Sequence, residues 1–190
     1  MKPKIIFRKI KEKTSSKEKQ SAMAQVLVLQ ATGERLKHSQ TGRPVVNQSM
    51  DVSISHKDNL VCVGVVPRPY RIGIDVERVD ANLNAELFLG PVINKAEQNC
   101  FGIFCEENNL SSASGIAIFW SIKEAFFKCL DYDLKPGKVS IMSIASDGRV
   151  IIDYADEIKQ LMTRRCLKIC SVKASFDQKY SYTQAIMKEN

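Results

Sequence analysis

Two carboxylate side chains, Asp75 and Glu77, lie two residues apart in the segment 73–77, which reads GIDVE. Residues at this spacing on a β-strand project from the same face, with Cα atoms roughly 6 to 7 Å apart, so the two carboxylates can share one cation. A hard ion such as Mg²⁺ suits carboxylate oxygens. Acidic residues at a strand end more often face water, so the pair alone leaves both interpretations open.

A second group of reactive side chains lies in the segment 119–128, which reads FWSIKEAFFK. If this segment is helical, Trp120, Glu124 and Lys128 follow one another at four-residue intervals and share one stripe of the helix. Glu124 would add a third carboxylate, with the Lys128 ammonium beside it. The alternative is an ordinary amphipathic helix with an exposed Glu–Lys pair. We expect Lys123, which is off this stripe, to be a surface charge.

A third group consists of the polar side chains in the segment 52–57, which reads VSISHK and ends a predicted strand: Ser53, Ser55, His56 and Lys57. Their hydroxyl, imidazole and ammonium groups could together hold phosphate oxygens. A histidine in a turn is more often simply exposed, so this group too is ambiguous when taken alone.

The composition restricts the kinds of metal and partner. The chain has only two histidines, and none of its six cysteines forms a Cys-x-x-Cys pair, so we expect no soft-metal site and mostly buried free thiols. A net charge of +7 favours an anionic partner, which could be nucleic acid, a polyphosphate ligand or an acidic protein. The alternative is that the charge only keeps the protein soluble. Aromatic residues make up only 7% of the chain and cluster on a core-facing helix, which argues against nucleic acid.

These groups must be positioned by two halves that offer similar elements. In the first half the polar and apolar pattern predicts strands at 4–10, 51–55 and 59–66, and a helix that opens on a capping box at Ser15 and Glu18 and runs toward Lys37. Pro67 and Pro69 mark the seam, because proline neither continues a strand ladder nor extends a helix.

The second half is predicted to contain one long helix over 114–130 with a small, largely antiparallel sheet. We expect its strands at 71–76, 138–145, 149–153, 167–175 and 182–187, and its shorter helices at 85–89, 92–104 and 156–162. The fold class is therefore α+β.

No apolar run approaches the roughly 18 residues of a membrane span. Residues 1–16 are charged throughout, where a signal peptide would need an apolar stretch. We therefore expect a cytoplasmic protein with no membrane partner.

Taken together and in this order, four segments resemble the signature of the 4′-phosphopantetheinyl transferase superfamily. Within it they resemble the Sfp-type enzymes, such as the surfactin-synthetase-activating enzyme and enterobactin synthase component D. The segments are 42–44 (GRP), 53–56 (SISH), 73–77 (GIDVE) and 120–128 (WSIKEAFFK). The resemblance implies two similar halves, 1–69 and 70–190, in a pseudo-twofold arrangement, each a long helix packed on a small sheet, with one site between them.

The resemblance also implies the roles of individual residues. Asp75, Glu77 and Glu124 would hold Mg²⁺, which suits three carboxylates completed by phosphate and water. The implied contacts to coenzyme A come from Arg43, Ser55, His56 and Lys128. Glu97 matches the acidic residue that helps to deprotonate the attacking serine.

The implied reaction transfers the 4′-phosphopantetheine group of coenzyme A to a serine of an apo acyl or peptidyl carrier protein and leaves 3′,5′-adenosine bisphosphate. An acidic carrier protein fits the basic balance of the chain. Because one chain of this length can supply both halves of the site, we expect a monomer. Where family members commonly carry an arginine for the 3′-phosphate of coenzyme A, this chain has Gln20, with Lys17 and Lys19 shortly before it.

Two other classes of function remain open on the sequence. One is a different Mg²⁺-dependent phosphohydrolase that acts on a nucleotide with the same carboxylates and turns over coenzyme A without a carrier protein. The other is a non-catalytic basic binding module, which would bind its ligand with a steep salt dependence.

Overall fold

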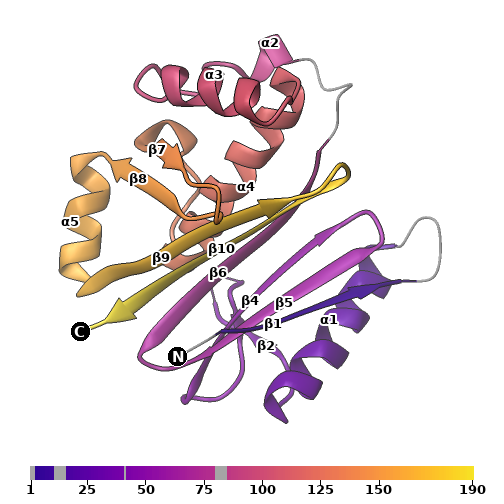
Figure 1. The fold of residues 1–190 in the computed structure, drawn as a ribbon. Coiled ribbons are helices and arrows are strands. Elements are labelled where there is room, and N and C mark those ends of the chain that lie inside the picture. Colours follow the sequence, from indigo (N-terminus) through magenta and orange to yellow (C-terminus); the bar gives the residue numbers. More distant parts are fainter. Residues whose placement is uncertain (1–2, 11–15, 41, 80–84) are drawn as a thin grey trace.

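The first half of the chain builds a three-stranded antiparallel sheet that is covered on one face by a helix (Figure 1). The computed structural model describes residues 3–10, 16–40, 42–79 and 85–190. The sheet has the order β1-β5-β4, and the covering helix is α1. Their bounds are β1 Lys4–Lys9, α1 Lys17–Thr32, β4 Met50–Lys57 and β5 Leu60–Pro67. Alternate valines of β4 and β5 pack against one face of α1 and form this half's core.

Helix α1 is shorter than predicted because a glycine ends it. Its N-cap is Ser16, whose side chain accepts a hydrogen bond from the Lys19 N–H, whereas the predicted cap Ser15 lies outside the described residues. The helix stops at Thr32, since Gly33 adopts the left-handed conformation with φ of 75° and closes the last turn. The prediction that it runs toward Lys37 was wrong, and the short strands β2 (Lys37–His38) and β3 (Pro44–Val45) follow instead.

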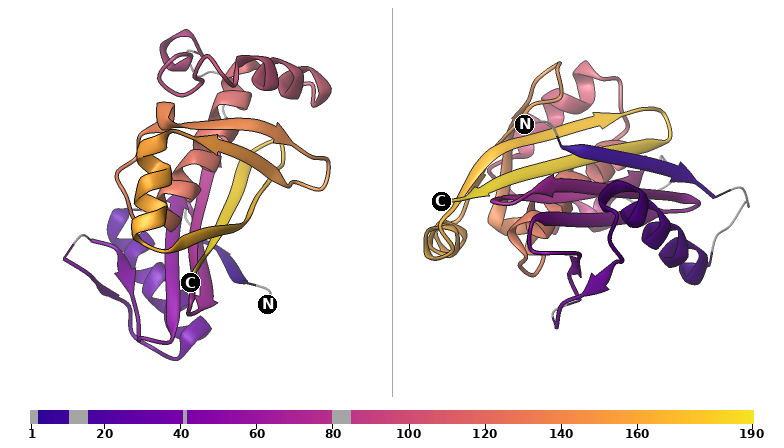
Figure 2. Two further views of the ribbon diagram at one scale, coloured as in Figure 1. Left: turned by 90° about the vertical axis from the view of Figure 1, so that its left-hand side faces the viewer. Right: turned by 90° about the horizontal axis from the view of Figure 1, so that it is seen from below.

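The second half places its long helix α4 against a sheet of order β6-β10-β9, with a β7-β8 hairpin beside it (Figures 1 and 2). The strands are β6 Tyr70–Arg78, β7 Val139–Ile144, β8 Val150–Tyr154, β9 Leu167–Phe176 and β10 Tyr180–Glu189. The helices are α2 Ala85–Phe88, α3 Gln98–Glu107, α4 Ser112–Leu130 and α5 Asp156–Arg164, with a short 3₁₀ helix at Pro136–Lys138. Three aromatic residues of α4, Phe119, Phe126 and Phe127, are buried, as expected for a core-facing helix.

The α+β prediction is therefore confirmed, with one long helix on a small antiparallel sheet in each half. The two sheets meet where β4 lies alongside β6, after the chain has turned at Arg68 and Pro69 (Figure 1). Whether the halves divide at residue 69 as separate units stays a prediction. None of the helices in the described residues is both long and apolar enough to cross a bilayer.

Gly73 allows α4 to approach β6 closely. A Cβ at this position would collide with the Ala125 carbonyl and the Cys129 N–H on α4, so a larger residue would push the helix away from the strand. This close approach matters because Asp75 is two residues further along β6 and Glu124 directly precedes Ala125 on α4.

All six cysteines are free. Cys62 and Cys129 are buried, and burial raises the pKa of each thiol to about 12, so both are unreactive. The expectation of mostly buried thiols was wrong, because Cys100 and Cys105 are only partly buried and Cys166 and Cys170 are exposed.

Candidate functional site

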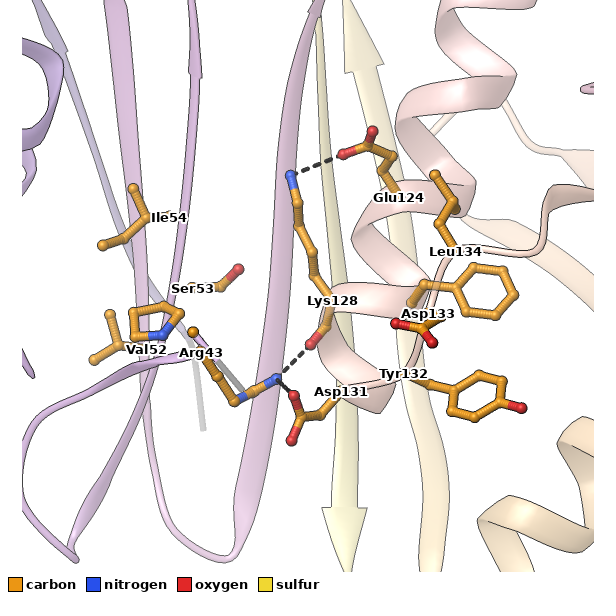
Figure 3. A pocket seen from close by; sticks show the side chains of 13 residues that line it. Arg43, Val52, Ser53, Ile54, Glu124, Lys128, Asp131, Tyr132, Asp133 and Leu134 are labelled. Carbon is orange, nitrogen blue, oxygen red and sulfur yellow. Dashed lines mark hydrogen bonds and ion pairs between the residues drawn. The ribbon is translucent and has the colours of Figure 1, made fainter. Parts of the chain in front are cut away.

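A cavity of about 530 Å³ lies between the two halves (Figure 3). One wall is strand β4 with the segment before it, and the other is the end of α4 with the loop that follows. Polar side chains from both walls face the cavity, among them Arg43, Ser53, Glu124 and Lys128. A cavity of this size can hold much of a nucleotide-sized ligand.

Lys128 joins the two carboxylates that the sequence placed on different elements. Its ammonium lies 2.6 Å from Asp75 Oδ1 on β6 and 3.0 Å from Glu124 Oε2, one turn earlier on α4. Burial alone would lower the pKa of Lys128, but the two carboxylates outweigh it and raise that pKa. One cation thus already bridges Asp75 and Glu124 at the edge of the cavity.

Asp75 is held in place from the side of β4. Its Oδ1 accepts a hydrogen bond of 2.8 Å from the Ser55 hydroxyl, in addition to the Lys128 ion pair. Its other oxygen, Oδ2, is buried and has no hydrogen-bond partner among the described residues. A buried carboxylate oxygen without a donor is costly unless something else compensates its charge.

Glu77 is not gathered with the other two carboxylates. It forms an ion pair with Lys57 at the end of β4. Within the part of the chain that the structure describes, no group of three or more histidine, cysteine, aspartate or glutamate side chains is arranged to hold a metal ion. Two of the three expected ligands are therefore together, and the third is turned toward Lys57.

Burial raises the pKa of Glu124, with a further contribution from the negative charge of Asp75, while Lys128 opposes the shift. The half-buried Glu124 carboxylate thus gains from any additional cation beside it. The predicted stripe of α4 is confirmed for Glu124 and Lys128, which form an i,i+4 ion pair. Trp120, also on this stripe, lines a separate cavity of about 370 Å³ together with Glu77 and Lys57.

Arg43 lines the cavity but is already engaged. Its guanidinium donates to Asp51 Oδ2 at 2.8 Å and to the Lys128 backbone carbonyl, and it lies 3.8 Å from Asp131 Oδ1. These contacts fix the planar group at the cavity wall. His56 is exposed at the end of β4.

Glu97 and Lys123 form a fully buried ion pair, with both side chains 0% exposed. The Lys123 ammonium also donates to the Val92 and Pro136 carbonyls, at 2.6 and 3.1 Å. The expectation that Lys123 is a surface charge was wrong, because α4 packs that face against the loop before α3. Glu97 does not line the cavity.

Gln20 is part of the scaffold of the first half. Its side chain is buried and donates to the Asp58 carbonyl at 2.7 Å in the β4-β5 turn.

Sequence reasoning missed Asp51 and gave Ser53 no role of its own. These two residues precede Ser55 at two-residue intervals on β4. Their side chains and that of Ser55 accept hydrogen bonds from successive outward N–H groups of β6. The available signal was the run of polar residues at alternate positions of a strand whose other residues are apolar, which marks a face that meets something polar.

A family model described as the 4′-phosphopantetheinyl transferase superfamily matches residues 71–180. This range contains Asp75, Glu77, Glu97, Glu124 and Lys128, whereas Arg43 and the β4 residues lie before it.

The solved structures similar to this one include two acyl-carrier-protein synthases. A holo-ACP synthase from Plasmodium yoelii is 18% identical, with a TM-score of 0.47 over 65% of this chain and 100% of that chain. An apo-ACPS structure from Chronobacterium ammoiniagenes is 14% identical, with a TM-score of 0.48 over 64% of this chain and 97% of that chain. No curated protein matches the sequence. The family model covers more than half of the chain, which therefore belongs to the 4′-phosphopantetheinyl transferase superfamily.

Proposed function

We propose that this protein transfers 4′-phosphopantetheine from coenzyme A to a serine of an apo acyl or peptidyl carrier protein, as an Sfp-type holo-carrier-protein synthase. The single observation that supports it best is the pair Asp75 and Glu124, joined through Lys128 at the edge of a cavity between the halves. Membership of the superfamily gives this arrangement its chemistry.

Asp75 and Glu124 fit a hard divalent cation such as Mg²⁺. The unpartnered, buried Oδ2 of Asp75 and the oxygen-only donor set favour such an ion over a softer one. Glu77 would join them after releasing Lys57. When bound, Mg²⁺ supplies positive charge against the diphosphate of coenzyme A.

The serine oxygen of the carrier attacks the β-phosphorus of coenzyme A. A new bond forms between that oxygen and phosphorus, and the bond to the oxygen bridging the two phosphates breaks. 3′,5′-Adenosine bisphosphate leaves with the bonding electron pair, and the serine proton passes to a base. Lys128 would offset charge on the transferred phosphoryl group, and Arg43 and His56 would contact the remaining phosphates and the nucleotide.

Glu97 stays our proposal for the acid–base role, although its position restricts how it acts. A carboxylate that is fully buried against Lys123 cannot touch the carrier serine directly in this arrangement. It would receive the proton only through water or after a local rearrangement.

The net charge of +7 suits an acidic carrier protein, because complementary charge steers encounter and suppresses wrong partners. We propose that the protein acts as a monomer in the cytoplasm, since both walls of the cavity come from one chain.

The test is intact-mass spectrometry of apo acyl, peptidyl and aryl carrier proteins incubated with this protein, coenzyme A and Mg²⁺. The controls are a chelator and a carrier whose acceptor serine is replaced by alanine. We expect a gain of one phosphopantetheine group that is absent in both controls. Turnover of coenzyme A without any carrier would instead indicate a phosphohydrolase, and absence of both transfer and coenzyme A binding would refute the proposal.

A further inference from the structure

Strand β6 has two edges, and among the residues that the structure describes only one of these edges pairs with a strand. Its N–H and carbonyl groups on one side bond to β10, while on the other side three alternate N–H groups donate to side chains of β4. The pairs are Ile72 N–H to Asp51 Oδ2 at 2.8 Å, Ile74 N–H to Ser53 Oγ at 3.0 Å, and Val76 N–H to Ser55 Oγ at 3.2 Å. We call Asp51, Ser53 and Ser55 the β4 ladder.

Two members of the β4 ladder are serines, and the hydroxyl of each accepts a hydrogen bond from an N–H group of β6. The two hydroxyls differ in which of their other hydrogen-bonding positions are used within the protein. A serine hydroxyl has one proton to donate and two lone pairs to accept with. The comparison of these two hydroxyls decides which of them can bind a ligand.

The Ser55 hydroxyl is fully used within the protein. Its proton goes to Asp75 Oδ1 at 2.8 Å, one lone pair accepts the Val76 N–H, and the Lys128 ammonium lies 3.4 Å from the same oxygen. Ser55 therefore has no proton left for a phosphate oxygen. Its bond instead fixes which way the Asp75 carboxylate points.

The Ser53 hydroxyl is only half used. It accepts the Ile74 N–H, and its proton has no acceptor among the residues that the structure describes. Ser53 is 4% exposed and lines the cavity between the halves, where Figure 3 shows its hydroxyl directed toward the side of Lys128. A buried hydroxyl proton at a cavity wall is a donor for whatever occupies that cavity.

We propose that the two serines divide two tasks: Ser53 binds coenzyme A by donating its hydroxyl proton to a phosphate oxygen, and Ser55 is a positioning residue that acts through Asp75. Ser53 is assigned a phosphate rather than a neutral group because Lys128 and Arg43, the cationic side chains of the cavity lining, lie on either side of its hydroxyl (Figure 3). This inference rests on the proposed function.

The two alanine variants are controls for each other. Ser53→Ala and Ser55→Ala each remove one acceptor from one N–H of β6, at neighbouring rungs of the same ladder, so any general loosening of the seam affects both. Thermal melting of each variant checks that they lose similar stability. The two readouts are the affinity for coenzyme A and the affinity for Mg²⁺, both measured by calorimetry, alongside the transfer rate.

We expect Ser53→Ala to weaken coenzyme A binding about tenfold to a hundredfold, the worth of a hydrogen bond to a charged group, with the Mg²⁺ affinity unchanged. We expect Ser55→Ala to weaken Mg²⁺ binding by about tenfold or more, as loss of a residue that orients a metal ligand does, with a smaller effect on coenzyme A. Ser53→Thr, which retains a hydroxyl on a strand, should restore coenzyme A binding.

Equal effects of the two alanine variants on both affinities would overturn the division of tasks, and so would wild-type affinity for coenzyme A in Ser53→Ala. If the variants gave those results while the wild-type protein modified a carrier, the division of tasks between the two serines would be refuted but the proposed function would stand. A wild type that neither binds coenzyme A nor transfers would refute both together.

Discussion

The buried ion pair between Lys123 and Glu97 can be tested by removing one charge. Lys123→Met keeps the length and apolar stem of the side chain and deletes an ammonium that lies 2.7 and 2.9 Å from the two Glu97 oxygens. It also leaves the Val92 and Pro136 carbonyls without their donor. Breaking a buried pair from one side costs about 3–5 kcal/mol, because an uncompensated charge stays behind.

The loss of stability caused by Lys123→Met should depend on pH, and the pKa of Glu97 decides in which direction. Burial raises the pKa of Glu97, and the hydrogen bond and charge of Lys123 oppose that rise. Without Lys123 the pKa of Glu97 rises further, so the folded variant binds a proton that the unfolded chain releases. The free energy of unfolding of the variant then falls as the pH rises from the pKa of Glu97 in the unfolded chain to its pKa in the folded protein. The loss caused by Lys123→Met should therefore be smaller at about pH 5 than at about pH 8.

Urea unfolding at both pH values measures these differences, and the melting temperature should fall by about 6–20 °C for a chain of this size. The matched control is Lys159→Met on α5, where an exposed lysine pairs with Asp156 three residues away and its loss should cost under about 0.5 kcal/mol. Adding Glu97→Gln to Lys123→Met should recover part of the lost stability, because the uncompensated charge is gone. A loss below about 1 kcal/mol at both pH values would refute the interpretation that Lys123 compensates the buried charge of Glu97.

Three further outcomes follow from the site and its packing. Asp75→Asn keeps the shape of the side chain but removes its charge, and it should lower the transfer rate by about a hundredfold or more while far-UV circular dichroism stays native. Lys128→Ala should raise the KM for coenzyme A about tenfold or more, whereas Lys159→Ala, which removes an exposed lysine charge on α5, should leave it unchanged. Gly73→Ala should prevent stable folding because its Cβ meets the backbone of α4, whereas Gly102→Ala on α3, where nothing lies within 4 Å, should stabilise by about 0.5–1 kcal/mol in thermal melts.

The helices and strands were predictable where the local pattern of polar and apolar residues determines them. The alternation of polar and apolar residues placed β4 and β5 within a few residues, and the helical spacing around Phe126 placed α4 correctly to its last residue. The end of α1 was missed because the helix was predicted to run past Gly33 toward Lys37, although a glycine after the last apolar residue is a common helix stop.

Whether a charged side chain is buried was not predictable from the spacing of residues along the sequence. Lys123 and Lys128 are both lysines on α4, yet Lys123 is fully buried because Glu97, distant in the sequence, lies where its ammonium points. Arg43 is engaged in the same way by the Lys128 carbonyl, 85 positions along the chain. A sequence pattern specifies which residues share a face, but partners that are distant in the sequence decide whether that face is solvated.

The charge of the whole chain also says little about the charge of the cavity. The chain is basic, at +7, yet the cavity is lined by three carboxylates, Glu124, Asp131 and Asp133, against two cations, Arg43 and Lys128. Arg43 is moreover already engaged within the protein. A lining of this kind repels a polyphosphate unless a further cation is added, which is the physical reason to expect that ligand binding here depends on a divalent ion. The excess positive charge of the chain therefore lies outside this lining, where it favours the approach of an acidic protein rather than the binding of a ligand in the cavity.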